Sequence, residues 1–184
     1  WLGAIIMGLL FPVFLIYIKE LLDTKIHSRK DIEDAIKVPI LGDIPLGDED
    51  QQLVVELDAR SNVAEAFRLI RTNLDFLLNA NSSREAKVIG VTSTVAGEGK
   101  SFVALNLAST LALSGKKVLL VGMDLRKPKL LEYFNIQSHK KGITHYLSDA
   151  SITVSDLIFA APNNVENMDL IESGLIAPNP AELL

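Results

Sequence analysis

The stretch KVIGVTSTVAGEGKS (Lys87–Ser101) decides how this chain is expected to fold. Val88–Thr92 is short, apolar and rich in β-branched residues, which predicts a buried parallel strand. A glycine-containing loop, Gly97-Glu98-Gly99-Lys100-Ser101, comes next, and Phe102–Leu113 has the composition of a helix. A strand, a glycine loop ending in Lys-Ser and a helix, in this order, predict a phosphate-binding loop.

Each part of this loop has a chemical role toward a nucleotide. Glycines let backbone N–H groups approach phosphate oxygens, and the amino end of the helix favours negative charge. Lys100 is expected to contact the β- and γ-phosphates, and the Ser101 hydroxyl to ligate Mg²⁺. The predicted ATP-binding residues in this loop are Ala96, Gly97, Glu98, Gly99, Lys100, Ser101 and Phe102.

One position departs from the strict pattern GxxxxGK[ST], because Thr94 stands where the first glycine belongs. The alternative is an ordinary turn between a strand and a helix, in which Gly99 only begins the helix. The complete strand, loop and helix context favours the phosphate-binding loop.

A second buried strand is predicted over Lys117–Val121, so the chain is expected to form an α/β fold with a parallel sheet flanked by helices. Ligands of open α/β sheets lie at the carboxyl ends of the strands, where Asp124 follows. Asp124 is therefore a candidate Mg²⁺ ligand or proton acceptor, and the alternative is a cap before Pro128. Arg126 is either a phosphate contact or a surface charge.

The first residues, Trp1–Ile18, contain no charged side chain. A membrane-spanning helix needs about 20 apolar residues, so this run predicts a truncated transmembrane helix rather than a signal peptide. A buried core helix is the alternative. Basic residues from Lys19 onward fit a cytoplasmic flank. The absence of a starting Met predicts that the chain is a fragment.

Between this helix and the phosphate-binding loop, the sequence predicts a connecting region. Ser28 and Asp31 form a capping-box pattern that begins a short helix. The acidic, polar stretch Gly47–Gln52 is the expected linker. We therefore expect three parts: a transmembrane helix at 1–18, a juxtamembrane segment and linker at 19–50, and a phosphate-binding domain at 51–184.

A further amphipathic helix is predicted over residues 62–79, with apolar residues at i, i+3 and i+4 on one face. Glu65, Arg68 and Arg71 are spaced three apart and form a charged stripe on another face. Taken alone, such a stripe is a solvated surface with weak ion pairs.

Composition excludes several classes of function. The net charge of −5 argues against a protein that coats nucleic acid, so no nucleic-acid partner is expected. The chain has no Cys, which excludes disulfides, thiol catalysis and Cys-based zinc sites. Its three His residues show no metal-ligand spacing.

Together the motifs resemble the bacterial tyrosine kinases that are fused to, or paired with, polysaccharide co-polymerases, the chain-length regulators of capsule and exopolysaccharide export. EAFRLIRTNLDF resembles the Glu-x-x-Arg-x-x-Arg helix of these kinases, and VTSTVAGEGKSFVALNLA resembles their Walker A motif. VLLVGMDLRKPKL resembles their Walker A′ motif, and GLIAPNPAELL their GxxPPNPxELL segment. The opening helix and its exit resemble the second transmembrane helix of a co-polymerase.

This resemblance implies an ATP-dependent protein-tyrosine autokinase that uses Mg²⁺ and regulates polysaccharide chain length and export. Lys100 and Asp124 would be catalytic, Ser101 and Asp124 would ligate the metal, and Arg126 would support them. Glu65, Arg68 and Arg71 would join copies of the chain into a ring. The protein would lie in the bacterial inner membrane, with a cytoplasmic kinase domain, and would work with the polysaccharide export machinery.

Two departures from the family pattern keep rival functions open. Walker A′ usually contains Asp-x-Asp, and here Gly122 replaces the first Asp. A Walker B strand and a tyrosine-rich tail are expected beyond Leu184, so the chain as given is expected to be inactive. One rival is a partition-type ATPase, which usually carries an extra Lys where Thr94-Val95-Ala96 stand. The other is a co-polymerase scaffold with a decayed nucleotide domain, which Gly122 supports and the intact GEGKS opposes.

Overall fold

The computed structural model describes residues 1–23, 25–46, 53, 55, 61–79, 86–136, 141–162 and 165–176. It divides into two compact units, Trp1–Ile40 and Leu41–Leu184. The expected linker Gly47–Gln52 and most of the segment resembling GxxPPNPxELL lie outside the described residues. The three-part division proposed from the sequence therefore stays a prediction.

The first unit contains two helices, α1 (Leu2–Leu21) and α2 (Arg29–Ala35). Helix α2 begins with the predicted capping box, in which Ser28 and Asp31 bond each other's backbone N–H groups. Helix α1 includes Pro12 and extends past the uncharged run to take in Lys19 and Glu20, so its apolar part is shorter than the helix. Across the described parts of the chain, no helix is long and apolar enough to cross a membrane, and the predicted transmembrane span is not confirmed.

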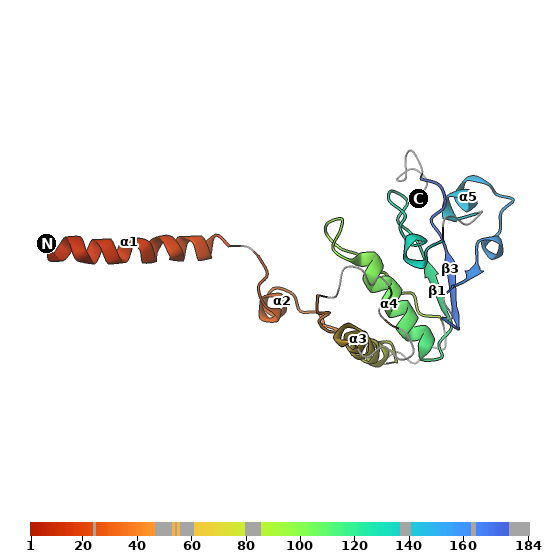
Figure 1. The fold of residues 1–184 in the computed structure, drawn as a ribbon, viewed down its shortest axis with the longest axis horizontal. Helices are drawn as coiled ribbons and strands as arrows, with labels where there is room; N and C mark the ends of the chain where they lie inside the picture. Colours follow the sequence, from red (N-terminus) through yellow and green to blue (C-terminus); the bar gives the residue numbers. More distant parts are fainter. Residues whose placement is uncertain are drawn as a thin grey trace. The chain divides into compact units, whose positions relative to one another are not determined.

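The second unit is built from helices layered against a three-stranded sheet (Figure 1). Its strands are β1 (Val118–Val121), β2 (Phe159–Ala160) and β3 (Met168–Ile171), in the order β1-β3-β2. The helical elements are α3 (Asn62–Asn79), α4 (Lys100–Leu113), η1 (Glu132–Phe134), α5 (Ile143–Ser148) and η2 (Val154–Asp156).

The sheet is mixed rather than purely parallel. Strand β1 pairs with β3 in parallel, in a register that runs from Val118 opposite Met168 to Val121 opposite Ile171. Strand β2 pairs with β3 in the antiparallel sense. The predicted second strand and the predicted helix at 62–79 are confirmed, and the α/β class holds.

The strand predicted over Val88–Thr92 is absent, which corrects the sequence-based expectation. These residues are described as irregular backbone, and Val88 is 97% exposed. A strand requires hydrogen bonds to a neighbouring strand, and the described part of the sheet pairs β1 only with β3. The phosphate-binding loop therefore begins from a segment that the described sheet does not hold.

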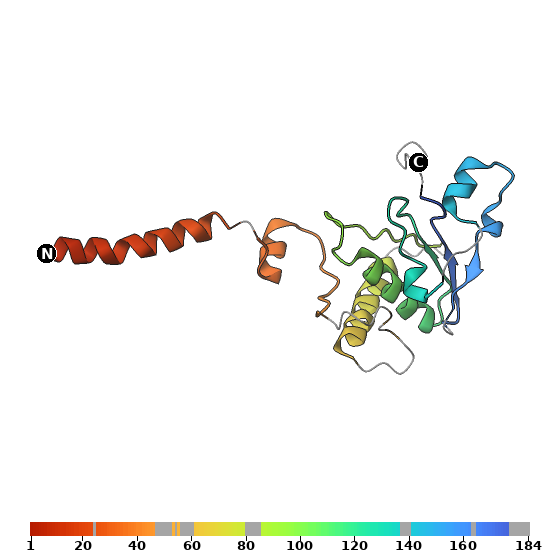
Figure 2. The same cartoon turned by 45° about the horizontal axis from the view of Figure 1, so that its top comes forward.

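Helix α4 lies between α3 and the sheet (Figure 2). On one side, Leu107 and Leu111 share a core cluster with the apolar face of α3, and the rings of Phe67 and Phe102 pack 5.8 Å apart at 59°. On the other side, Leu105 is fully buried in a cluster that includes β3. Burial on both sides holds α4 over Leu105–Ala112, and the loop precedes the half-buried first turn of this helix.

Polar contacts tie α4 to its surroundings. The buried Asn106 accepts a 3.2 Å hydrogen bond from the Val55 N–H and donates one of 2.9 Å to the Phe102 oxygen. Its amide therefore satisfies a backbone donor that would be costly to bury alone. Just past the helix, Lys116 forms a 2.7 Å ion pair with Asp75 of α3.

Candidate functional site

The loop between residues 93 and 100 turns on two glycines. Gly97 and Gly99 have φ angles of 91° and 88°, in the left-handed region that favours glycine. No heavy atom lies within 4 Å of a Cβ built at either residue, so the backbone angle rather than space requires glycine there. Gly99 caps α4, and its oxygen accepts a 2.9 Å hydrogen bond from the Val103 N–H.

Lys100 folds back over this loop. Its Nζ donates to the Ser93 Oγ at 2.8 Å and to the Val95 oxygen at 3.2 Å. The positive charge thus lies between the start of the loop and the amino end of α4, where the partial charge of the helix is also positive. A polyphosphate placed here would meet a cation, turned backbone and the adjacent Ser101 hydroxyl, so these residues fit ATP.

Glu98 makes contacts that the sequence did not predict. Its carboxylate accepts a 3.0 Å hydrogen bond from the Val95 N–H and bonds of 3.1 and 3.3 Å from the Thr94 hydroxyl. The Val95 N–H and then the Ser93 hydroxyl lower the pKa of the Glu98 carboxyl from its ordinary value. The only signal for this pairing in the sequence was Thr94 itself, at the place of a glycine.

Asp124 follows the carboxyl end of β1, as predicted. Its Oδ1 accepts hydrogen bonds from the backbone N–H groups of Arg126 at 3.1 Å and Lys127 at 3.0 Å. These bonds close a local turn, and no helix begins at residues 124–128, so the helix cap that the sequence left open as the alternative is not formed there. The turn is anchored by Leu125, which is buried, while the Asp124 and Arg126 residues are exposed.

Gly122 is closely surrounded. It donates a 2.8 Å hydrogen bond to the Ile171 oxygen and accepts one of 2.8 Å from the Ser173 hydroxyl. A Cβ at this position would lie 3.1 Å from the Ser173 Oγ and 3.3 Å from Leu130 Cδ2. A larger residue here would therefore require its neighbours to move.

The loop and the turn after β1 lie at the same end of the second unit in both views of the ribbon (Figures 1 and 2). The predicted nucleotide-binding loop and the turn after β1 are thus at one end of this unit. Within the described ranges, no group of three or more His, Asp or Glu side chains is arranged to hold a metal ion. Metal binding at Ser101 and Asp124 stays a prediction, in which a nucleotide would supply further oxygens.

The predicted charged stripe lies on α3. Arg68 donates to Glu65 at 2.5 Å, and the Glu65 side chain is 64% exposed. Arg71 is half-buried. Three apolar side chains of the same helix are also exposed, Leu69 at 63%, Phe76 at 78% and Leu77 at 40%. The exposed surface of α3 therefore combines charge with apolar area.

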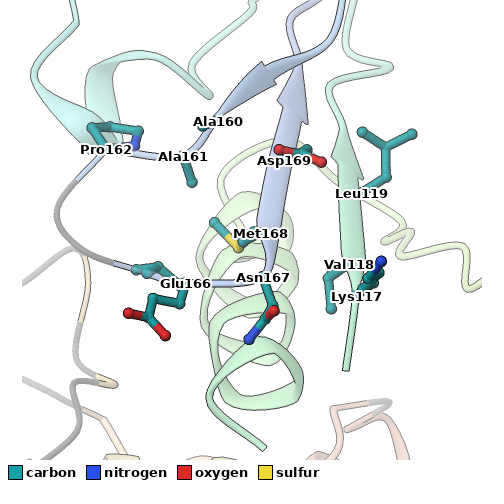
Figure 3. A pocket seen from close by; sticks show the side chains of 11 residues that line it. Lys117, Val118, Leu119, Ala160, Ala161, Pro162, Glu166, Asn167, Met168 and Asp169 are labelled. Atoms are coloured by element: carbon teal, nitrogen blue, oxygen red, sulfur yellow. The ribbon is translucent and has the colours of Figure 1, made fainter. Parts of the chain in front are cut away.

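A shallow pocket of about 610 Å³ lies elsewhere, at the amino ends of β1 and β3 (Figure 3). Lys117, Asn167 and Asp169 contribute polar side chains to it, and Leu119 and Met168 contribute apolar ones. Asp124 follows the opposite, carboxyl end of β1, and none of the predicted site residues lines this pocket.

Comparison with known proteins points to one group. The model of the AAA domain matches residues 86–179. The tyrosine-protein kinase YwqD of Bacillus subtilis is 40% identical over 134 residues, which cover 73% of this chain and 54% of that protein. The tyrosine-protein kinase wzc of Salmonella typhi is 28% identical over 200 residues, covering 100% of this chain and 27% of that protein.

A solved structure agrees with these matches. The BceF tyrosine kinase domain superimposes with a TM-score of 0.70 at 29% identity, over 87% of this chain and 67% of that one. The chain thus spans about half the length of the Bacillus relative and about a quarter of the Salmonella one.

Proposed function

Because this chain belongs to the AAA-domain family and its relatives are bacterial tyrosine-protein kinases, we propose that it is part of an ATP-dependent protein-tyrosine autokinase. In this reaction a tyrosine oxygen forms a bond to the γ-phosphorus of ATP while the bond to the β–γ bridging oxygen breaks. ADP leaves, and the tyrosine proton passes to a base. The kinase would act in the control of capsule or exopolysaccharide chain length and export.

The observation that carries this proposal is the loop itself. Two glycines with left-handed backbone, a lysine folded over them and a helix that begins at that lysine form a positive, polar cradle. Such a cradle suits the phosphates of a nucleotide. Phosphoryl transfer depends chiefly on positioning and on stabilisation of charge, which this arrangement supplies.

The roles of individual residues follow from their places. Lys100 would leave Ser93 and Val95 and bind the β- and γ-phosphates. The N–H groups of residues 96–102 would hold phosphate oxygens, and Ser101 and Asp124 would hold Mg²⁺, which neutralises phosphate charge when bound. Asp124 would also accept the tyrosine proton, with the Arg126 side chain near the phosphates.

Assembly and location are further parts of the proposal. Self-association through Glu65, Arg68 and Arg71 into a ring would bring the tyrosines of one copy to the nucleotide of the next. The polysaccharide export machinery at the bacterial inner membrane is the proposed partner, with the kinase domain on the cytoplasmic side. These proposals rest on the resemblance and on the exposed position of α3.

A second candidate is a nucleotide-binding scaffold or regulatory ATPase without kinase activity. Two observations favour it: Gly122 is packed so that an acidic side chain does not fit without movement, and Asp124 is engaged in capping its own turn. Both candidates require ATP binding and differ in whether tyrosine is phosphorylated.

The test is direct. Lys100→Met removes the ammonium and keeps a side chain of similar length, so the affinity for Mg·ATP measured by calorimetry should fall at least tenfold, or about 1.4 kcal/mol. Labelled ATP should then mark tyrosine in the full-length protein and not in its Lys100→Met variant. ATP binding without labelling would favour the scaffold, and equal ATP affinity in both proteins would overturn the assigned loop.

A further inference from the structure

We propose that Glu98 is a positioning residue that clamps the phosphate-binding loop through Thr94 and Val95, and so holds the loop in the shape that receives a polyphosphate. This inference rests on the proposed nucleotide-binding function. Thr94, the residue that departs from the strict loop pattern, gains a role in this way, because its hydroxyl donates to the Glu98 carboxylate.

The contacts close a ring across the loop. One carboxylate oxygen of Glu98 accepts from both the Val95 N–H at 3.0 Å and the Thr94 hydroxyl at 3.3 Å, and the other accepts from the same hydroxyl at 3.1 Å. Gly97, with its φ of 91°, turns the chain back so that residue 98 faces residue 94. The two sides of the loop are thus joined by charge-assisted hydrogen bonds.

The loop needs such a clamp because the structure provides few other contacts that hold its amino-terminal side. The helix holds its end from Lys100 onward, but Val88–Thr92 is not part of the described sheet. Residues 94–98 are exposed, so no core packing fixes their conformation. Local hydrogen bonds therefore hold the conformation of the loop on its amino-terminal side.

Val95 links the clamp to the lysine. Its N–H donates to Glu98, while its oxygen accepts from Lys100 Nζ at 3.2 Å. When the lysine turns to a phosphate, it gives up the oxygen, and Glu98 still holds the N–H. The clamp would therefore keep the loop open during the step in which Lys100 changes partner. A preorganised loop loses less conformational freedom on binding.

The experiment compares ATP and ADP affinities by calorimetry for the chain and for variants of each clamp partner. Thr94→Val removes the hydroxyl, and Glu98→Ala removes the acceptor. Each should weaken both affinities about fivefold, as expected for loss of a charge-assisted hydrogen bond at the site. The affinity of the double variant should be no lower than that of the single variant with the lower affinity, because the two residues act as one unit. Glu98→Gln retains acceptor oxygen and should recover most of the affinity.

Thr153 and Asp156 supply a matched control pair. The Thr153 hydroxyl donates to the Asp156 carboxylate at 2.9 Å in a similar exposed turn. Thr153→Val and Asp156→Ala should leave both affinities unchanged. Amide hydrogen exchange at residues 93–99 should become faster in Thr94→Val and Glu98→Ala, with unchanged melting temperatures showing that the fold is intact.

The results distinguish failure of the clamp from failure of the proposed nucleotide-binding function. Loss of binding in Lys100→Met with unchanged affinity in Glu98→Ala would overturn the clamp and leave the nucleotide site standing. Tighter binding by Glu98→Ala and Glu98→Gln would show that the carboxylate only repels phosphate, which also overturns the clamp. Additive losses from Thr94→Val and Glu98→Ala would show that the two residues act separately. Failure of the unaltered chain to bind Mg·ATP would instead contradict the proposed function.

Discussion

The Ser173 hydroxyl donates a 2.8 Å hydrogen bond to the backbone oxygen of Gly122. Gly122 also donates its own N–H to Ile171, so the ladder between β1 and β3 continues past the end of β1. A side chain at position 122 would meet the same Ser173 Oγ at 3.1 Å. The kinases that the chain resembles carry the first aspartate of Walker A′ at this position. Here the position holds a glycine that packs against a serine two residues past the end of β3.

Gly122→Ala should lower the free energy of unfolding by about 1 kcal/mol, because Ser173 and Leu130 must give way to the new methyl group. Gly90→Ala is the matched control, since no heavy atom lies within 4 Å of a Cβ there. Urea unfolding of both variants measures the difference, and the control corrects for the lost freedom of glycine in the unfolded chain. Equal stability of the two variants would contradict close packing at Gly122.

Asp124→Asn separates the two interpretations of this residue. Asparagine keeps an oxygen that accepts from the Arg126 and Lys127 N–H groups, so the turn and the circular dichroism spectrum should be unchanged. The lost negative charge should reduce tyrosine labelling of the full-length protein at least tenfold if Asp124 holds Mg²⁺ or accepts the proton.

Asp149 provides the control for this substitution. Its Oδ1 accepts from the Ser151 N–H at 2.9 Å in a comparable turn, away from the loop. Tyrosine labelling of the Asp149→Asn variant should equal that of the unaltered protein. Full labelling of Asp124→Asn would leave this residue only a structural role and would place the base or metal ligand elsewhere.

Sequence patterns predicted the elements that depend on local chemistry. The capping box at Ser28 and the amphipathic helix α3 need only the side chains within a few residues, and both form as expected. Val88–Thr92 has strand composition, but strand formation depends on a neighbour from a distant part of the chain, which composition does not reveal. The mixed sheet was missed for the same reason, because β2 is short and pairs antiparallel to β3.

The candidate site shows the same division. Lys100 and the two glycines are fixed by the motif, and their backbone geometry fits the predicted loop. The turn that Asp124 closes with the N–H groups of Arg126 and Lys127 was not predicted, because the sequence offered a helix cap as the alternative and no helix begins there. The contact between Glu98 and Thr94 depends on how the loop turns at Gly97, and a motif that expects glycine at position 94 gives no indication of it.

The pKa of Glu98 provides a test based on pH. Hydrogen bonds from the Val95 N–H and then the Ser93 hydroxyl lower it from the ordinary 4.5. A carboxyl with a lowered folded-state pKa contributes fully above its ordinary value and loses that contribution as the pH falls through the folded-state value. Carbon-detected NMR titration should therefore find the pKa of Glu98 below 4.5, with faster amide exchange of the loop only under more acidic conditions. A value at or above the ordinary one would contradict these hydrogen bonds.

Helix α3 carries the surface proposed for assembly. Glu65 and Arg68 form an ion pair within one chain. The same helix also has exposed apolar side chains, chiefly Phe76 at 78% and Leu69 at 63%. Positions 69 and 76 are two helical turns apart, so their side chains share one side of α3. Protein interfaces typically place aromatic residues at their centre and charges around them. We therefore expect both the charges and Phe76 to contribute to contacts between copies.

Replacing Glu65, Arg68 and Arg71 together by Ala should convert the oligomer to a monomer in light scattering of the full-length protein. Phe76→Ser should weaken association at least tenfold, because a central aromatic residue often contributes about 2 kcal/mol or more. Asp75→Ala is the control on the same helix, since this residue is already paired with Lys116 within the chain at 2.7 Å.

Tyrosine labelling should fall with assembly while ATP affinity stays unchanged, because the ring brings one copy's tyrosines to the next copy's nucleotide. An unchanged mass in the triple variant would identify the stripe as a solvated helix face, and a lower ATP affinity would show that α3 supports the nucleotide site rather than a contact between copies.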